Sequence, residues 1–165
     1  MTHPLKVNGQ FSLKKLFIAV LGTWAVGIVS SFFTIRAREI YQNLAQPAFA
    51  PPGWVFGPVW TLLYIIMGLA AYRVWMVGTK NHVVRNALMF FVLQLEFNFV
   101  WSLLFFWLSW RGAAFIEILL LWIFIGITMA QFKKVDNGAF YLLIPYWLWV
   151  SFAAVLNYSI WILNR

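Results

Sequence analysis

The chain has 165 residues, of which 64% are hydrophobic and only 10% are charged, whereas a soluble domain usually carries about 25% charged residues. This composition excludes an ordinary soluble domain and indicates an integral membrane protein. The formal charge of +8 does not indicate nucleic-acid binding, because the twelve basic residues are dispersed among the predicted helix ends.

The chain begins with a polar segment, residues 1–14, which we expect to be flexible, and continues as a single transmembrane domain, residues 15–165. Each of its apolar runs is long enough to cross a hydrocarbon core of roughly 30 Å at about 1.5 Å per helical residue. The alternation typical of a membrane barrel is missing from the sequence, so we predict an all-α membrane protein with a five-transmembrane-helix bundle. The first run is too long for a signal-peptide core and is expected to be retained. The predicted spans are about 15–35, 53–77, 84–107, 113–132 and 139–163.

The first span carries small residues at a strict four-residue interval, a pattern that lets another helix approach closely. The approaching helix could be a neighbour in the bundle or the same helix of a second subunit. The residues of this ridge are Ala19, Thr23, Gly27 and Ser31. Residues 36–52 form the longest connection, in which we expect a short interfacial helix near residues 40–45.

The second span begins at a rigid turn. The prolines at 51–52 donate no backbone hydrogen bond and keep the chain extended, and Gly53 then permits the turn into a helix. Beyond this turn, Trp60 and Tyr64 lie one above the other on the same helix face. The turn therefore presents an aromatic stripe to the interior of the bundle.

Five spans place the two termini on opposite sides of the membrane. The side of the amino terminus holds eight of the twelve basic residues, which favours a cytoplasmic amino terminus and a carboxyl terminus on the other side. The basic residues of the second side are Arg36, Arg38, Arg111 and Arg165. The sequence does not identify the membrane.

Three helices present aromatic and amide side chains at a common depth. Counted from the ends of their spans, Trp60, Trp101 and Ala153 lie roughly 10–15 Å below the same surface, and the connection 36–52 covers that surface. Such a mixture suits a flat, mostly apolar ligand that is held by stacking and positioned by a few amides. The stripes give the candidate ligand-binding residues Trp60, Tyr64, Gln94, Asn98, Trp101, Tyr146, Trp149, Ala153 and Asn157.

The same residues have plainer explanations. Tryptophans also form membrane-interface belts or fill cores, and buried amides also bond across helices. The intramembrane acids Glu96 and Glu117 are functional candidates, but Glu96 lies about 200° around the helix from Gln94 and Asn98 and should point away from the pocket.

The sequence argues against metal, thiol and ordinary acid–base chemistry. It contains no cysteine, and its two histidines, His3 and His82, lie outside the predicted spans. No clustered ligands for a metal ion occur, and buried histidine is not available as an axial haem ligand. We therefore expect no metal site and no required cofactor.

Three ordered blocks, residues 51–64, 94–102 and 145–157, resemble the TspO/MBR family of tryptophan-rich sensory proteins and translocator or peripheral benzodiazepine receptor proteins. The similarity covers about residues 15–164. It implies a five-helix bundle, commonly a homodimer, that binds porphyrins, haem, sterols and synthetic benzodiazepine- or isoquinoline-type ligands under the first loop. It adds Tyr41 to the candidate pocket and implies that a larger side chain at Ala153 would intrude on ligand.

The chain departs from the family pattern in two places. Ile40 and Gln46 replace the tryptophan and lysine that often flank the loop tyrosine, which affects the ligand contacts expected of the loop. The sterol-recognition pattern that begins at Val155 is incomplete, because Ile162 stands where a basic residue is expected. Sterol binding is therefore expected to be weak or incidental.

Three functions follow as alternatives. The first is a membrane sensor or transporter that binds porphyrin- or haem-type tetrapyrroles. The second is a light- and oxygen-dependent porphyrin-degrading enzyme, for which the resemblance implies catalytic roles for Trp60 and Trp149. The third is a structural scaffold whose pocket holds membrane lipid. The expected partners are porphyrin-type molecules, lipid and a second copy of the chain, and nucleic acid is not expected.

Overall fold

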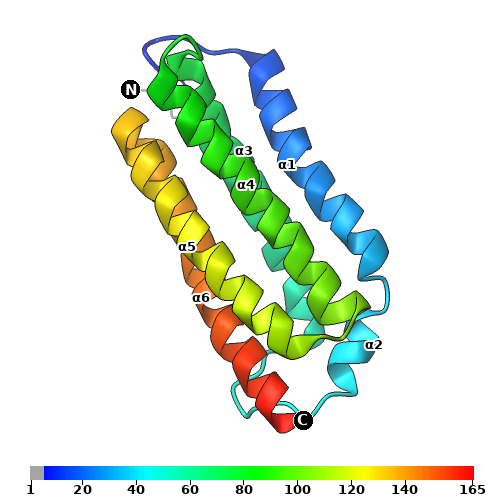
Figure 1. The fold of residues 1–165 in the computed structure, drawn as a ribbon. Coiled ribbons are helices and arrows are strands. Elements are labelled where there is room, and N and C mark those ends of the chain that lie inside the picture. Colours follow the sequence, from blue (N-terminus) through cyan, green and yellow to red (C-terminus); the bar gives the residue numbers. More distant parts are fainter. Residues whose placement is uncertain (1–5) are drawn as a thin grey trace.

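The computed structural model describes residues 6–165, and part of the predicted flexible segment, residues 1–5, lies outside the described residues. Five long helices lie side by side in a bundle (Figure 1). Within residues 6–165 these five are long and apolar enough to cross a membrane, and the residues form no strand beyond an isolated bridge between Val7 and Gln10. The all-α, five-helix prediction is confirmed. The five helices are α1 (Leu13–Phe33), α3 (Phe56–Val77), α4 (His82–Ser102), α5 (Arg111–Val135) and α6 (Asn137–Leu163).

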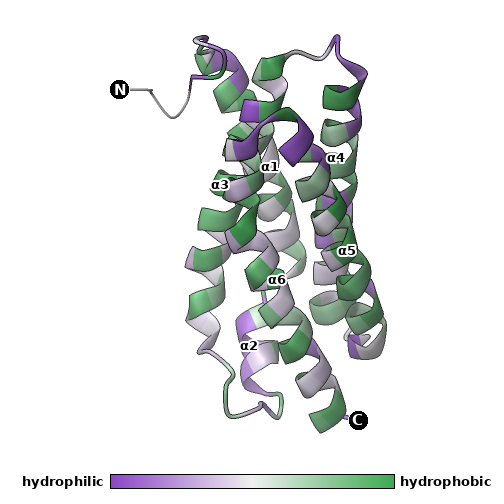
Figure 2. Ribbon diagram, turned by 90° about the vertical axis from the view of Figure 1, so that its left-hand side faces the viewer, coloured by the Kyte–Doolittle hydropathy of each residue, from purple (hydrophilic) through white to green (hydrophobic). Residues whose placement is uncertain are grey.

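Three shorter elements of the described chain lie at one end of the bundle. The helix α2 (Ala37–Gln42) and the 3-10 turn η1 (Gly53–Val55) lie between α1 and α3, and α4 continues into the π-helical turn η2 (Leu103–Trp107). We call the end that carries α2 and the carboxyl terminus the loop end, and the opposite end the amino-terminal end (Figure 1). Hydrophobic residues follow the length of the helices, and hydrophilic residues are concentrated toward the two ends (Figure 2).

Side-chain caps explain where several helices begin. Ser12 accepts a hydrogen bond from Lys15 N–H at 3.4 Å, so α1 begins two residues before the predicted boundary. Asn81 accepts from Val83 N–H at 2.9 Å at the start of α4. Each cap satisfies one of the backbone donors that a helix amino terminus leaves unpaired.

Residues 6–12, the described part of the predicted flexible segment, lie against the amino-terminal end of the bundle. Val7 is buried in a small cluster with Tyr72 and Met76. The backbone N–H of Ser12 donates to the Tyr72 hydroxyl at 3.2 Å. This part of the segment is therefore tied to α3.

The ridge of small residues on α1 packs against α3 of the same subunit. Thr23 Oγ1 donates to the backbone oxygen of Tyr64 at 2.9 Å. A Cβ atom on Gly68 would lie 2.6 Å from Val20 Cα, and one on Gly27 would lie 2.5 Å from the Tyr64 ring. The glycines permit this close approach, so the ridge serves the bundle itself.

Candidate ligand pocket

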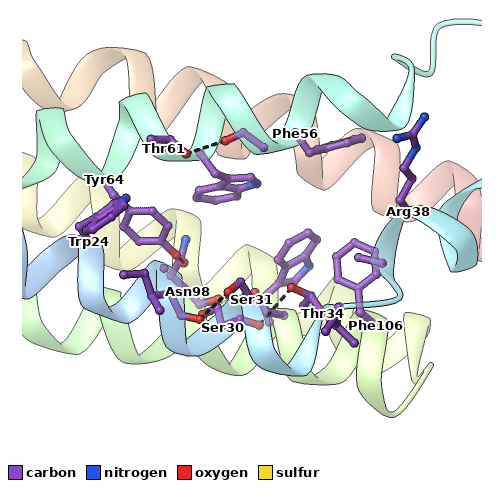
Figure 3. A pocket seen from close by; sticks show the side chains of 18 of the residues that line it. Trp24, Ser30, Ser31, Thr34, Arg38, Phe56, Thr61, Tyr64, Asn98 and Phe106 are labelled. Carbon is purple, nitrogen blue, oxygen red and sulfur yellow. Dashed lines mark hydrogen bonds between the residues drawn. The ribbon is translucent and has the colours of Figure 1, made fainter.

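A cavity of about 460 Å³ lies toward the loop end, bounded mainly by α1, α3, α4 and η2. This volume falls within the range of about 300–1,000 Å³ that is typical of small-molecule pockets. Figure 3 shows side chains from several helices converging on this space. The residues that line it include Trp24, Gly27, Ile28, Ser30, Ser31, Thr34, Arg38, Phe56, Gly57, Trp60, Thr61, Tyr64, Asn98, Trp101 and Phe106.

Two tryptophans form the aromatic wall of the cavity. The ring of Trp60 lies 6.5 Å from that of Trp101, with an angle of 33° between the planes. Trp60 also lies 5.8 Å from Tyr64, one helical turn further along α3, at 34°. The rings of Trp101 and Tyr64 are thus each only moderately inclined to the ring of Trp60, an arrangement that offers flat apolar surface for stacking.

A chain of buried hydrogen bonds runs from the cavity into the bundle. The Tyr64 hydroxyl donates to Asn98 Oδ1 at 2.6 Å, and Asn98 Nδ2 donates to the Tyr146 hydroxyl at 3.1 Å. The Tyr146 hydroxyl in turn donates to Gln94 Oε1 at 2.8 Å. Because buried polar groups that lack partners are costly, this network fixes the rotamers of its members. The amide of Asn98 is therefore held in place at the cavity.

A second buried amide positions Trp101. The indole Nε1 of Trp101 donates to Asn157 Oδ1 at 3.0 Å, and Asn157 Nδ2 donates to the backbone oxygen of Arg111 at 3.0 Å. Asn157 is 1% exposed, and one amide therefore joins α4, α5 and α6. Asn157, which does not line the cavity, therefore fixes the orientation of the Trp101 ring.

The first connection folds over the loop end. Tyr41 is buried; its hydroxyl donates to Pro51 O at 3.0 Å, and its ring lies 5.1 Å from that of Phe56. Asn164 tethers this connection to α6, because its side chain accepts from Ala45 N–H at 3.0 Å and donates to Ala45 O at 2.9 Å. Hydrogen bonds thus hold the connection at two places, within itself and to the end of α6.

The structure sorts the ten predicted ligand-binding residues into three groups. Trp60, Tyr64, Asn98 and Trp101 line the cavity. Gln94, Tyr146 and Asn157 lie behind it and hold the lining residues by hydrogen bonds. Tyr41, Trp149 and Ala153 are outside the lining. Ligand contact by the ten residues stays a prediction.

Phe56 lies next to the predicted residue Trp149. The two rings are 5.9 Å apart at 67°, and Phe56 lines the cavity whereas Trp149 does not. The indole Nε1 of Trp149 is buried and has no hydrogen-bond partner within residues 6–165. The face of α6 predicted to line the pocket is therefore separated from it by residues of α3.

Sequence reasoning missed the contribution of α1 and α2. Trp24, Ile28 and Ser31 lie on one face of α1 at helical spacing, the signal that could have identified them. Arg38 projects from α2 at the loop end of the cavity (Figure 3). Arg38 has no ion pair in the described chain, whereas its neighbour Glu39 pairs with Arg36 at 3.0 Å.

The two intramembrane acids lie away from the cavity lining. Glu96 borders a separate apolar groove of about 750 Å³ between α1, α3 and α4, in agreement with its predicted direction. Glu117 is buried, and neither of its carboxyl oxygens has a hydrogen-bond partner among residues 6–165.

Neither histidine is among the described residues that line the cavity. His82 begins α4, and His3 lies outside the described residues. No group of three or more potential metal-ligating side chains occurs in the described part of the chain.

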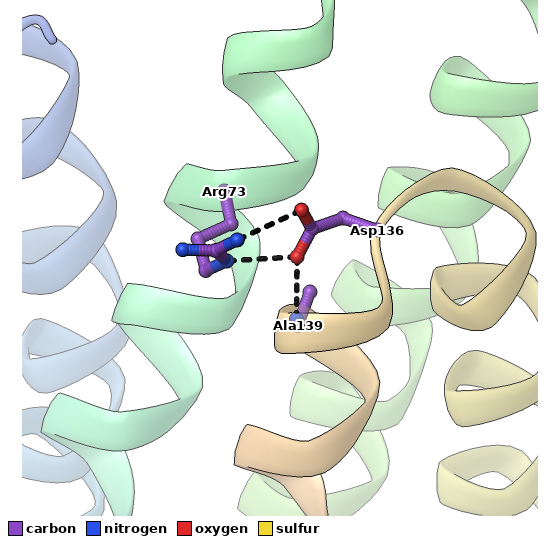
Figure 4. A network of polar contacts seen from close by, with 3 residues as sticks. All are labelled: Arg73, Asp136 and Ala139. Atoms are coloured by element: carbon purple, nitrogen blue, oxygen red, sulfur yellow. Dashed lines mark hydrogen bonds and ion pairs between the residues drawn. The ribbon is translucent and has the colours of Figure 1, made fainter. Parts of the chain in front are cut away.

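An ion pair closes the amino-terminal end (Figure 4). Arg73 Nε and Nη2 contact the two carboxyl oxygens of Asp136 at 2.7 and 2.9 Å, and Asp136 Oδ1 accepts from Ala139 N–H at 2.6 Å. Burial alone would raise the pKa of Asp136, but the hydrogen bonds from Arg73 and the backbone outweigh it and lower that pKa below its ordinary value. A Cβ on Gly138 would lie 2.7 Å from Arg73 Nε, so glycine leaves room for the guanidinium.

The fold and the cavity define a helical, multi-pass membrane protein with an aromatic pocket of ligand size. Residues 19–162 match the TspO/MBR family. The tryptophan-rich protein TspO of Chlorobaculum tepidum is 44% identical over 141 residues, covering 85% of this chain and 89% of the relative. The TspO of Archaeoglobus fulgidus is 38% identical over 93% of this chain and 99% of the relative, and the translocator protein of Homo sapiens is 37% identical over 73% and 72%. The chain belongs to the TspO/MBR family, as the three sequence blocks predicted.

Proposed function

We propose that this membrane protein binds porphyrin- or haem-type tetrapyrroles in the aromatic cavity and acts as a sensor or transporter for them. The observation that carries the proposal is the combination of a tryptophan wall, a fixed amide and a cation around one cavity. Names of relatives such as tryptophan-rich sensory protein and translocator protein are consistent with sensing or transport.

The chemistry of the lining matches a planar, amphipathic ligand. Trp60 and Trp101 present ring faces on which a tetrapyrrole can stack, and Asn98 offers an amide at the cavity. Arg38 supplies a positive charge at the loop end, where the anionic side groups of a porphyrin can pair with its guanidinium. The ligand would therefore lie with its apolar ring inward and its charged edge toward Arg38.

This function requires no resident cofactor, because porphyrin or haem is the ligand. We propose a homodimer in contact with membrane lipid, with weak sterol binding and no nucleic-acid partner. The excess of basic residues toward the amino-terminal end supports a cytoplasmic location for that end.

Titration with protoporphyrin in the dark, following tryptophan quenching in purified protein, tests the proposal. We expect saturable binding by the wild type and strong loss of affinity in Trp60→Leu, which removes part of the wall. Trp54→Leu is the matched control, because Trp54 is 64% exposed and outside the lining. Equal, non-saturating quenching in all three proteins would mean that porphyrin only partitions into detergent, and the scaffold function would then be favoured.

A light-dependent porphyrin-degrading activity is the second candidate, and the position of Trp60 in the cavity wall favours it. A porphyrin stacked there and excited by light could take one electron from the indole, which leaves an indole radical cation and a porphyrin radical anion, and dissolved oxygen would supply the oxidant that degrades the porphyrin ring. Loss of porphyrin absorbance under illumination in air, faster with wild type than with Trp60→Phe, would support this activity. Equal rates with and without protein would exclude it.

A further inference from the structure

The first connection lies at the loop end of the cavity, where the lining residues Ile35 and Arg38 are exposed. The first connection is held by the hydrogen bond from Tyr41 to Pro51 O and by the pair of hydrogen bonds between Asn164 and Ala45. The latter two residues are 119 positions apart in sequence, so the tether joins the connection to the last helix. These contacts hold the connection in place at this end of the cavity.

Near the loop end, aromatic contacts bridge the side between α1 and α4. The ring of Phe33 packs edge-on against Phe99 at 5.7 Å and against Trp107 at 5.6 Å, both at 79°. These contacts join the end of α1 to α4 and the π-helical turn. Aromatic side chains thus connect these helices beside the loop end of the cavity.

The side between α1 and α3 is different. The two helices pack tightly as far as Gly27 and Tyr64, beyond which Gly57 and Thr61 on α3 line the cavity and are also exposed. A Cβ atom on Gly57 would meet no atom within 4 Å. On α1, the cavity-lining residues Trp24 and Ile28 are 41% and 38% exposed. Residues that face the cavity and the outside together mark an opening.

The depth of this opening places it along the membrane-spanning part of the helices. Thr61 lies five residues beyond the start of α3, about 8 Å along the axis, and Trp24 lies nine residues before the end of α1, about 14 Å. The Ser31 hydroxyl donates to Ile28 O at 2.6 Å and the Thr61 hydroxyl to Gly57 O at 2.9 Å. Since these hydroxyls are already paired, they can face lipid at little cost.

We propose that the ligand reaches the cavity sideways from the bilayer, through a slit between α1 and α3 bounded by Trp24, Ile28, Gly57 and Thr61. This inference rests on the proposed function and specifies the class of ligand: a flat amphipathic molecule already dissolved in the membrane. Its apolar body passes edge-on through the slit, while its anionic edge stays at the membrane surface near Arg38. Water-soluble molecules without an apolar face would be excluded by the route.

Reversible cross-linking across the slit tests this route, and the absence of native cysteine makes the labelling specific. In Ile28→Cys/Thr61→Cys, a short bifunctional thiol reagent that reductant can cleave joins α1 to α3. Association and dissociation of protoporphyrin are followed by stopped-flow fluorescence in lipid nanodiscs in the dark. We expect both rates to fall several-fold and by the same factor, with an unchanged dissociation constant, and to recover on reduction.

Matched controls separate the slit from other effects. The two single-cysteine variants, treated with the same reagent, report its local effect on the cavity. Ala45→Cys/Asn164→Cys locks the loop end, and its cross-link should leave both rates unchanged. Slower rates with the loop locked and unchanged rates with the slit locked would overturn the inference. If the wild type showed no saturable binding, the proposed function itself would be overturned. If binding persisted and the cross-linked slit left both rates unchanged, only the entry route would be overturned.

Discussion

The indole N–H of Trp101 and the side-chain oxygen of Asn157 form a buried hydrogen bond of 3.0 Å between α4 and α6. This bond links the wall of the cavity to α6, a helix that does not line the cavity. Asn157 also donates to Arg111 O at the start of α5. The packing between the helices and the shape of the pocket therefore both depend on the side-chain amide of Asn157.

Replacing Asn157 with leucine should damage both stability and binding. The substitution keeps a similar volume but leaves the buried Trp101 N–H unpaired, at a cost of about 1–3 kcal/mol, and it also removes the hydrogen bond to Arg111 O. We expect a lower unfolding midpoint and weaker porphyrin binding, measured by thermal unfolding and dark titration. Ser159→Ala on the same helix, whose hydroxyl donates to Val155 O one turn earlier, should change neither. Wild-type affinity in Asn157→Leu would show that the bond does not position Trp101.

Arg38→Gln should weaken the binding of free-acid porphyrin several-fold and leave that of the uncharged dimethyl ester nearly unchanged. The reason is that the guanidinium pairs with the anionic edge, an interaction that salt also screens. Dissociation constants for both porphyrins at two salt concentrations provide the measurement. Arg36→Gln is the control, because Arg36 pairs with Glu39 and does not line the cavity. Equal losses for acid and ester would argue against a charge contact.

Gly68→Ala should destabilise the bundle by about 1–3 kcal/mol, because the added methyl group lies 2.6 Å from the backbone of Val20 and must push α1 away from α3. Gly22→Ala on α1 meets no atom within 4 Å and should be neutral or stabilising by about 0.5–1 kcal/mol. Unfolding midpoints in the same detergent compare the two. A tolerated Gly68→Ala would mean that the helices are less closely packed than described.

The ion pair between Arg73 and Asp136 should make stability depend on acidity. The pKa of Asp136 is lower in the folded protein than its ordinary value of 3.8. Its contribution is therefore present above the unfolded pKa and is lost as pH falls through the folded pKa. Asp136→Asn should lower the unfolding midpoint at neutral pH and flatten its dependence on pH in this acidic range. Glu39→Gln, which removes an exposed pair, should have little effect; parallel pH profiles for Asp136→Asn and wild type would contradict the assignment.

The five spans could be predicted because length and hydrophobicity alone determine whether a helix can cross a bilayer. The stripe through Trp60 and Tyr64 on α3 also follows from helical spacing, as does the stripe through Asn98 and Trp101 on α4. Periodicity gives the direction of a side chain around its own helix but does not identify the helices that enclose a cavity. For this reason the sequence favoured Trp149 and Ala153 and missed α1.

Other features depend on contacts between distant segments. The tether joins the backbone of Ala45 to the side chain of Asn164, and neither residue carries a local signal for it. The π-helical turn Leu103–Trp107 lies in an apolar run that reads as ordinary helix. The ridge on α1 indicated close packing with another helix, but only the structure shows that this helix is α3.

The most direct test of the central claim fills the cavity without disturbing its walls. Gly57 lines the cavity, and a side chain added there meets open space, whereas Gly126 on α5 offers equal space outside the lining. Dark titration with protoporphyrin should therefore show saturable binding by wild type and Gly126→Leu, and little or none by Gly57→Leu, with all three proteins equally folded. Binding by Gly57→Leu at wild-type affinity would contradict the account and place the tetrapyrrole elsewhere on the protein.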